Sequence, residues 1–293
     1  FFYDDKNGFQ KVKTAFEIFN IPFKLNILKN ITNQNKNIEL ISKKIRLNLE
    51  SSIEYDNSEI SGFLDIDLFN KNNSFNYVIK NEKLNFLSKD KKFSGGFNFK
   101  PFYFYSNLSF DYVSQRKIFQ SESLILDVLD SELLNNPNLS AFIKIDVDKI
   151  DKFEYLTDFI LEIQFDNGKI FMSNFDVKWN QAVTIKSNDI EFANDNDGKK
   201  FIGEILFDFN DVEKFFRYFQ IKRNYRDVFD EIKADFVYDF TQDKLVLNNI
   251  MIDNKSNQIL EDFLELYNSK NKNLFNKVTF RNFVKDFFLA YAG

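Results

Sequence analysis

Apolar and polar residues alternate along most of this chain, and short groups of Asn, Asp, Ser and Gly interrupt the alternation. One alternating run extends from Ile45 to Tyr55, and a second follows Asp56-Asn57-Ser58 and extends from Ile60 to Leu68. Successive side chains point to opposite sides of a strand, so each run predicts a β-strand with one apolar face. The residues at the break favour a tight turn. We therefore expect consecutive runs to pair as antiparallel neighbours.

The most aromatic part of the chain, residues 97–112, continues this pattern but changes phase in the middle. Phe97 and Phe99 alternate in one phase, and Phe102 and Phe104 alternate in the other after Pro101. Proline has no N–H to donate to a sheet. Pro101 therefore predicts an edge, a bulge or a break between two strands.

The second half of the chain repeats the alternation, notably over residues 159–165, 201–209 and 232–240. Asp166-Asn167-Gly168 is a strong hairpin signal. Asp195-Asn196-Asp197-Gly198 predicts a further turn.

Four segments instead carry apolar residues at helical spacing. They are residues 123–135, a segment 212–219 with Asn210 as the expected N-cap, residues 259–267, and residues 280–291. The last helix could lie on a membrane or dock on the protein's own sheet. Its polar face mixes basic residues with Asn282 and Asp286, whereas an interfacial helix is typically rich in Lys and Arg, so we favour docking.

These patterns predict a mainly β chain with inserted helices. We expect a long, antiparallel, meandering and curved sheet with an apolar concave face, closed by the carboxy-terminal helices. A soft division falls near residue 121. It separates a β-sheet region, 1–121, from a β-sheet region with inserted and carboxy-terminal helices, 122–293. We expect the two regions to be continuous in one elongated unit.

Composition then narrows the possible functions. The chain of 293 residues contains 39 Phe but no His and no Cys. Catalysis by a Ser-His-Asp triad or by a thiol, the usual zinc sites and disulfides are therefore excluded. A net charge of −5 argues against nucleic acid as a partner. No run approaches the ~18 apolar residues of a membrane span. We expect no cofactor, no metal and no enzymatic activity.

Some polar groups suggest chemistry, and each also has an ordinary structural interpretation. Asp65/Asp67 and Asp146/Asp148 could form a carboxylate dyad of a glycan hydrolase, but the solvated face of a strand explains them as well. Residues 193–204 match a calcium loop in part, but the first ligand position is Ala193 and the flanks predict strands, which favours a hairpin turn. A basic cluster could meet phosphate headgroups, although a solvated helix face is the favoured reading; it comprises Lys214, Arg217, Lys222, Arg223 and Arg226.

Three stretches together resemble a known family. They are Ile60-Ser-Gly-Phe-Leu-Asp-Ile-Asp with Phe93-Ser-Gly-Gly-Phe-Asn-Phe-Lys-Pro-Phe-Tyr-Phe, the segment from Leu126 to Ala141, and the alternating segments from Gly203 to Asp253. On the basis of these stretches, the chain from about residue 40 onward resembles the carboxy-terminal part of AsmA-like proteins, relatives of the TamB and YhdP type in Gram-negative bacteria. The resemblance implies a periplasmic body, an inner-membrane anchor upstream of Phe1, and a role in moving phospholipid and in outer-membrane biogenesis. It implies no catalytic residues.

The leading hypothesis is therefore a membrane-anchored periplasmic protein that shields or transfers phospholipid along an apolar sheet groove. Its partners would be acyl chains, and other envelope proteins are further candidates. The alternative is a non-catalytic structural or protein-binding module of the cell envelope. The candidate lipid-binding residues, all on expected apolar strand faces, are Phe159, Leu161, Ile163, Phe175, Val177, Trp179, Ile205, Phe207, Phe209, Phe236, Tyr238 and Phe240.

Overall fold

The computed structural model describes residues 2–4, 8–18, 21–31, 35–44, 47–56, 59–68, 71–113, 137, 140–150, 153–195, 198–269 and 277–292. The chain forms two compact units. Unit 1 is built mainly from Phe1–Ser109, and unit 2 mainly from Lys144–Gln164 and Lys169–Gly293. Among the described residues, strands dominate both units and the helices follow β16, so the expected mainly β fold with carboxy-terminal helices is confirmed.

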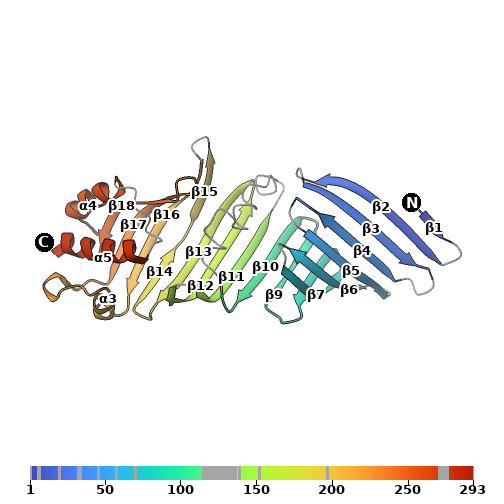
Figure 1. Cartoon of the computed structure of the whole chain (residues 1–293), viewed down its shortest axis with the longest axis horizontal. Helices are drawn as coiled ribbons and strands as arrows, with labels where there is room; N and C mark the ends of the chain where they lie inside the picture. The colour runs from blue at the N-terminus through green and yellow to red at the C-terminus, as the bar shows by residue number, and fades with distance from the viewer. Residues whose placement is uncertain are drawn as a thin grey trace. The chain divides into compact units, whose positions relative to one another are not determined.

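Unit 1 is an antiparallel meander in which each strand pairs with the next one along the chain (Figure 1). Lys100 and Pro101 form the turn between its last two strands, so the predicted break at Pro101 is confirmed. The strands are β1 (Phe2–Asp4), β2 (Phe9–Ile18), β3 (Ile21–Asn30), β4 (Lys36–Ser42), β5 (Leu47–Asp56), β6 (Glu59–Leu68), β7 (Lys71–Lys80), β8 (Lys83–Ser88), β9 (Phe93–Phe99) and β10 (Phe102–Phe110).

The register of unit 1 places most apolar side chains of its middle strands on one face and most polar side chains on the other. Leu40 of β4 lies opposite Leu25 of β3 and Leu49 of β5. One residue earlier on β4, Glu39 lies opposite Asn26 and Glu50. Because neighbours along a strand point to opposite faces, unit 1 has one apolar and one polar face.

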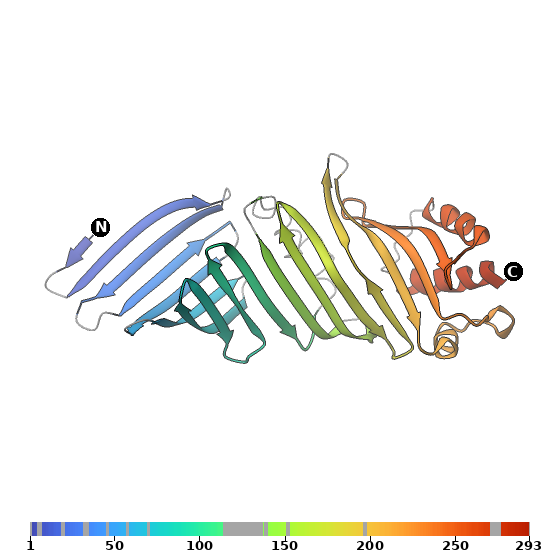
Figure 2. The ribbon, with the colours of Figure 1, turned by 180° about the vertical axis from the view of Figure 1, so that it is seen from behind.

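Unit 2 also contains an antiparallel meander, and it has helices after β16 (Figures 1 and 2). β14 and β15 both pair with β13 on one side and with β16 on the other, so together they act as one interrupted strand. The strands are β11 (Ala141–Ile150), β12 (Phe153–Asp166), β13 (Lys169–Trp179), β14 (Val183–Ser187), β15 (Ile190–Asp195), β16 (Gly198–Phe209), β17 (Glu231–Asp239), β18 (Lys244–Ile252) and β19 (Lys255–Ser256). The helices are α3 (Val212–Phe219), the short 3-10 helix η1 (Arg223–Tyr225), α4 (Gln258–Asn268) and α5 (Lys277–Ala292).

Three of the four predicted helices are present, and the fourth, at residues 123–135, lies outside the described residues. The predicted N-cap of α3 was wrong by one residue. Asp211, not Asn210, accepts a hydrogen bond from the Lys214 N–H at 2.8 Å. An acidic side chain at the helix N-terminus also stabilises the helix, because it lies at the positive end of the helix dipole.

The helices cover the apolar face at the carboxy-terminal end of the unit 2 sheet. α3 contributes Phe216, which is completely buried, and α4 contributes Leu260, which is also completely buried. α5 contributes Phe287 and Phe288 to the same core. The prediction that the last helix docks on the protein's own sheet is therefore confirmed.

α4 also covers the backbone edge of β18. The Asn268 side chain donates to the Leu247 carbonyl at 2.9 Å and accepts from the Leu247 N–H at 3.4 Å. Glu261 accepts from the Ile250 N–H. A free strand edge can recruit another strand, and these side chains occupy the groups that would do so.

This contact generates a prediction for Asn268→Ala. The loss of two hydrogen bonds to partly buried backbone groups should lower the free energy of unfolding by about 1–3 kcal/mol. Trp179, the only tryptophan in the chain, reports the unfolding of unit 2 in a urea titration. Glu265→Ala is the matched control, since Glu265 is exposed on the same helix. Equal losses for both variants would contradict the role of Asn268.

Candidate functional site

The twelve candidate lipid-binding residues share one face of the unit 2 sheet. In the register of β16, Phe207 lies opposite Ile185 of β14 and Ile232 of β17. Phe236 of β17 lies opposite Gly203 and Leu247. The face is therefore continuous across these strands, as the alternation in the sequence predicts.

Four of the twelve residues belong to the core that the helices cover: Trp179 and Phe209 are buried in it, and Ile205 and Phe207 pack against it while partly buried. Trp179 is 4% exposed, and its ring stacks on Phe219 of α3 at 5.3 Å between centroids. Phe209 contacts Phe215 of α3 edge-on at 5.2 Å. At this end the helices occupy the positions that a lipid would take, so the aromatic residues form an ordinary protein core.

A second apolar cluster lies further from the helices. Phe159, Leu161 and Val177 are buried in it, whereas Ile163 and Phe175 are only partly buried. Among the described residues, no helix contributes to this cluster. Its surface is therefore the part of the candidate site in unit 2 that α3, α4 and α5 do not cover.

Tyr238 and Phe240 belong to an aromatic group with Phe192 and Phe201. Phe240 contacts Phe201 edge-on at 4.7 Å and Tyr238 at 4.8 Å. The Tyr238 hydroxyl donates to Asp243 at 2.8 Å. Burial, reinforced by this carboxylate, raises the pKa of Tyr238 far above its ordinary value, so its hydroxyl stays protonated and the residue contributes an apolar ring.

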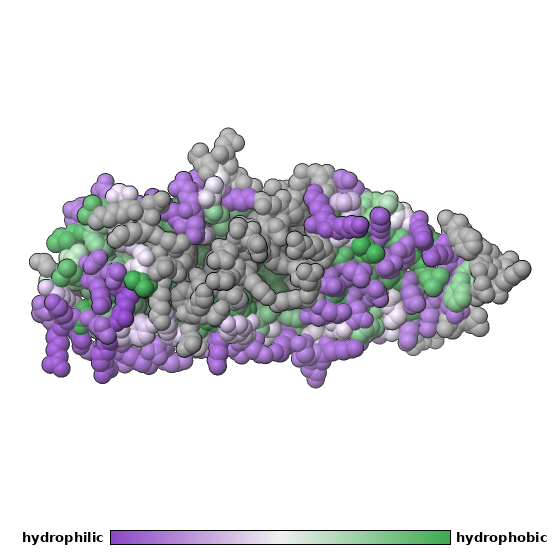
Figure 3. Space-filling view, viewed as in Figure 1, coloured by the Kyte–Doolittle hydropathy of each residue, from purple (hydrophilic) through white to green (hydrophobic). Residues whose placement is uncertain are grey.

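Sequence reasoning missed the apolar face of unit 1 as a candidate site. Its side chains are mostly partly exposed, and the described residues of this unit include no helix that covers them. Figure 3 shows apolar side chains between polar ones over this part of the chain. The alternation over residues 47–55 and 60–68 carries the signal for this face. The central residues of this face, which we call the unit 1 apolar face, are Leu25, Leu40, Leu49, Leu64, Ile66, Phe75, Tyr77, Phe86, Phe97 and Phe104.

Glycines allow aromatic rings to lie close to the strands of this face. A Cβ at Gly62 would lie 2.6 Å from Cζ of Tyr77, its cross-strand partner. A Cβ at Gly95 would lie 2.7 Å from Cζ of Phe86. The Tyr77 hydroxyl shares a hydrogen bond of 2.8 Å with Ser51, so its polar atom has a partner on the same face.

The two alternatives based on acidic residues gain no support from the geometry. Asp65 accepts a hydrogen bond from Ser74 at 2.5 Å on the polar face of unit 1, and Asp146, which belongs to unit 2, lies 4.0 Å from Lys144. β15 and β16 pair up to Asp195 opposite Gly198, as a hairpin requires. Among the described residues, no group of three or more acidic side chains is arranged to hold a metal ion.

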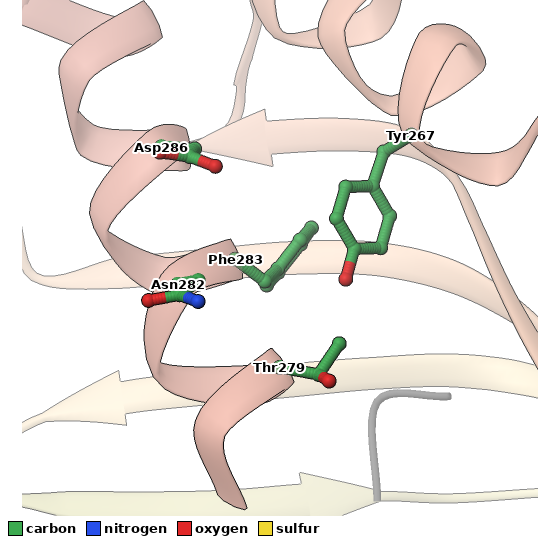
Figure 4. A pocket seen from close by; sticks show the side chains of 5 residues that line it. All are labelled: Tyr267, Thr279, Asn282, Phe283 and Asp286. Carbon is green, nitrogen blue, oxygen red and sulfur yellow. The ribbon is translucent and has the colours of Figure 1, made fainter. Parts of the chain in front are cut away.

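A shallow pocket of about 230 Å³ lies between α4 and α5 (Figure 4). Tyr267 points from α4 towards Phe283 of α5, with 4.7 Å between the ring centroids. Drug-sized ligands usually occupy larger cavities, of roughly 300–1,000 Å³. The pocket is too small for a phospholipid acyl chain together with its headgroup.

Comparison with protein-family models, with curated proteins and with solved structures finds no match to this chain. Among the described helices, none combines the length and the apolar character that crossing a bilayer requires. The functional argument therefore rests on the two apolar sheet faces.

The close approach at Gly62 generates a prediction for Gly62→Val. The new side chain would overlap the Tyr77 ring and should destabilise the fold by about 1–3 kcal/mol. Ser61→Val is the matched control, because Ser61 is the preceding residue and points to the polar face. Thermal unfolding followed by circular dichroism measures both. Wild-type stability in Gly62→Val would show that the ring does not need this space.

Proposed function

We propose that this protein shields phospholipid acyl chains on the apolar faces of its antiparallel sheets. One observation carries the proposal: the apolar side chains of successive unit 1 strands share one face and remain partly exposed. Contiguous exposed apolar surface is unusual in soluble proteins and marks sites of interaction with apolar partners. A sheet face with the opposite side polar suits a long, flexible and apolar ligand.

The mechanism needs no bond chemistry. Each methylene group that moves from water onto an apolar surface contributes about 0.8 kcal/mol. Contacts of this kind have no directional requirement, so one face can accept chains of different length and saturation. Strand geometry presents the side chains in regular rows, about 4.8 Å apart from strand to strand.

The cellular setting of the proposal comes from the resemblance to AsmA-like proteins. On that ground we propose that the protein acts in the periplasm at the inner membrane, with a role in outer-membrane biogenesis. The absence of His and Cys fits a protein that works by burial rather than by catalysis.

A second candidate function is a structural or protein-binding module of the cell envelope. The helix-covered end of unit 2 favours it for that part of the chain, because Trp179 and Phe209 are sealed in a core. The two candidate functions make different predictions for the unit 1 apolar face. Acyl-chain shielding requires this face to contact lipid, whereas a structural or protein-binding module does not.

The proposal predicts that Leu40→Gln/Leu64→Gln impairs lipid retention. Both leucines lie on the unit 1 apolar face, and a loss of about 1.5 kcal/mol of apolar contact should lower the phospholipid recovered about tenfold. Native mass spectrometry and lipid extraction of the purified protein measure the bound phospholipid.

Ile41→Gln/Phe63→Gln is the matched control. Each residue is the neighbour of a tested leucine on the same strand and points to the polar face. The control should retain phospholipid as the parent chain does. If the parent chain carries no phospholipid, or if both double variants lose it equally, acyl-chain shielding on the unit 1 apolar face is wrong.

A further inference from the structure

The segment from α3 to the start of β17 has a charge opposite to that of the whole protein. Lys214–Arg226 contains five basic residues and no acidic residue, in a chain whose net charge is −5. α3 directs Phe215, Phe216 and Phe219 into the core. Its basic residues are consequently left on the outer side of the helix, where Arg217 is exposed.

Four of these five cations have no acidic partner among the described residues. Arg226 is the exception: it pairs with Glu213 at 3.0 Å and donates from two guanidinium nitrogens to the Ile221 carbonyl. The four that form no such pair are Lys214, Arg217, Lys222 and Arg223.

The loop that follows presents an apolar side chain to solvent. Val228 is 84% exposed, the highest value among the large hydrophobic residues that the structure describes. Its neighbour Phe229 is 2% exposed and stacks on Phe288 of α5 at 5.6 Å. The loop is therefore held by the buried Phe229 and by the hydrogen bonds of Arg226 to Ile221. Val228 is exposed in a loop that is anchored on both sides of it. Figures 1 and 2 show this loop extending beyond the strands beside α5.

The acidic residues nearby reduce the positive charge only in part. Asp211 caps α3, and Glu213 pairs with Arg226. Asp227 accepts a hydrogen bond from the Val228 N–H, and Asp230 follows at the start of β17. Asp253 adds a further carboxylate at this end of the loop, where it accepts hydrogen bonds from the Asp230 and Glu231 N–H groups. The four cations without acidic partners lie on α3 and in the first part of the loop, and Asp227, Asp230 and Asp253 lie at its other end beside the exposed Val228.

We propose that α3 and the loop to Phe229 form a docking surface for a bilayer rich in anionic phospholipid. Lys214, Arg217, Lys222 and Arg223 contact the phosphate groups, and Val228 enters the region between the headgroups and the acyl chains. Basic residues contribute about 1 kcal/mol each near an anionic membrane surface, and an adjoining apolar side chain adds contact that salt does not screen. This surface is separate from the unit 1 apolar face and does not depend on acyl-chain shielding.

The test is co-sedimentation of the protein with vesicles. The parent chain should bind vesicles of phosphatidylglycerol and phosphatidylcholine in equal amounts more tightly than vesicles of phosphatidylcholine alone. Lys222→Gln/Arg223→Gln should weaken binding to the anionic vesicles about tenfold, and Val228→Ser should weaken it by a smaller factor that persists at high salt. Inorganic phosphate at the same phosphate concentration should not release the protein, which separates a membrane surface from a free-phosphate site.

Lys13→Gln/Lys43→Gln is the matched control, since it removes two exposed charges from unit 1. It should bind the anionic vesicles as the parent chain does. Trp179 fluorescence and thermal unfolding establish that each variant is folded. Equal weakening in both double variants, or no preference of the parent chain for anionic vesicles, would overturn the proposal. Phospholipid retention measured by native mass spectrometry should be unchanged in Lys222→Gln/Arg223→Gln. Vesicle binding therefore tests the docking surface, and phospholipid retention separately tests acyl-chain shielding.

Discussion

An apolar sheet face is stable in water only when something covers it, and this requirement organises both units of the protein. In unit 2, α3, α4 and α5 place phenylalanine and leucine side chains over the last strands and seal Trp179 and Phe209. In unit 1, the described residues provide strands alone, and the rows of leucine and phenylalanine stay partly exposed. The same alternating sequence pattern thus produces a closed core in one place and an open apolar face in another.

Helix α4 also covers the edge of the unit 2 sheet at β18. Asn268 and Glu261 of α4 bond the free backbone groups of β18, so the helix covers an edge as well as a face. An apolar face that ends at a closed edge can accept a ligand without recruiting further strands at that end. The basic surface of α3 lies in this same helical region, so it presents positive charge to the surroundings while its aromatic side holds the core.

Much of the fold could be predicted from periodicity, because side-chain direction in a strand depends on position alone. The alternation of Phe236 and Tyr238 identifies their shared face, and the spacing of Phe283, Phe287 and Phe288 identifies α5. The phase change within β13 is visible in the same way, because the apolar residues switch from Ile170 and Met172 to Val177 and Trp179, and these four side chains are buried. Periodicity could not reveal that Asn268 bonds a strand edge, since one polar residue at a helix end has no periodic signature. Above all, whether a face is covered depends on segments distant in the sequence, so periodicity alone cannot separate the covered Trp179 and Phe209 from residues on an open face.

Quenching of tryptophan fluorescence by phospholipids with brominated acyl chains tests the central claim most directly, because bromine quenches only at close range. The native Trp179, sealed beneath α3, is compared with the tryptophan introduced by Phe104→Trp in a Trp179→Phe background, on the unit 1 apolar face. The account predicts strong quenching at position 104 and almost none at Trp179 when the protein is loaded with brominated phospholipid. Quenching at Trp179 with none at position 104 would contradict it, as would the absence of quenching at both positions.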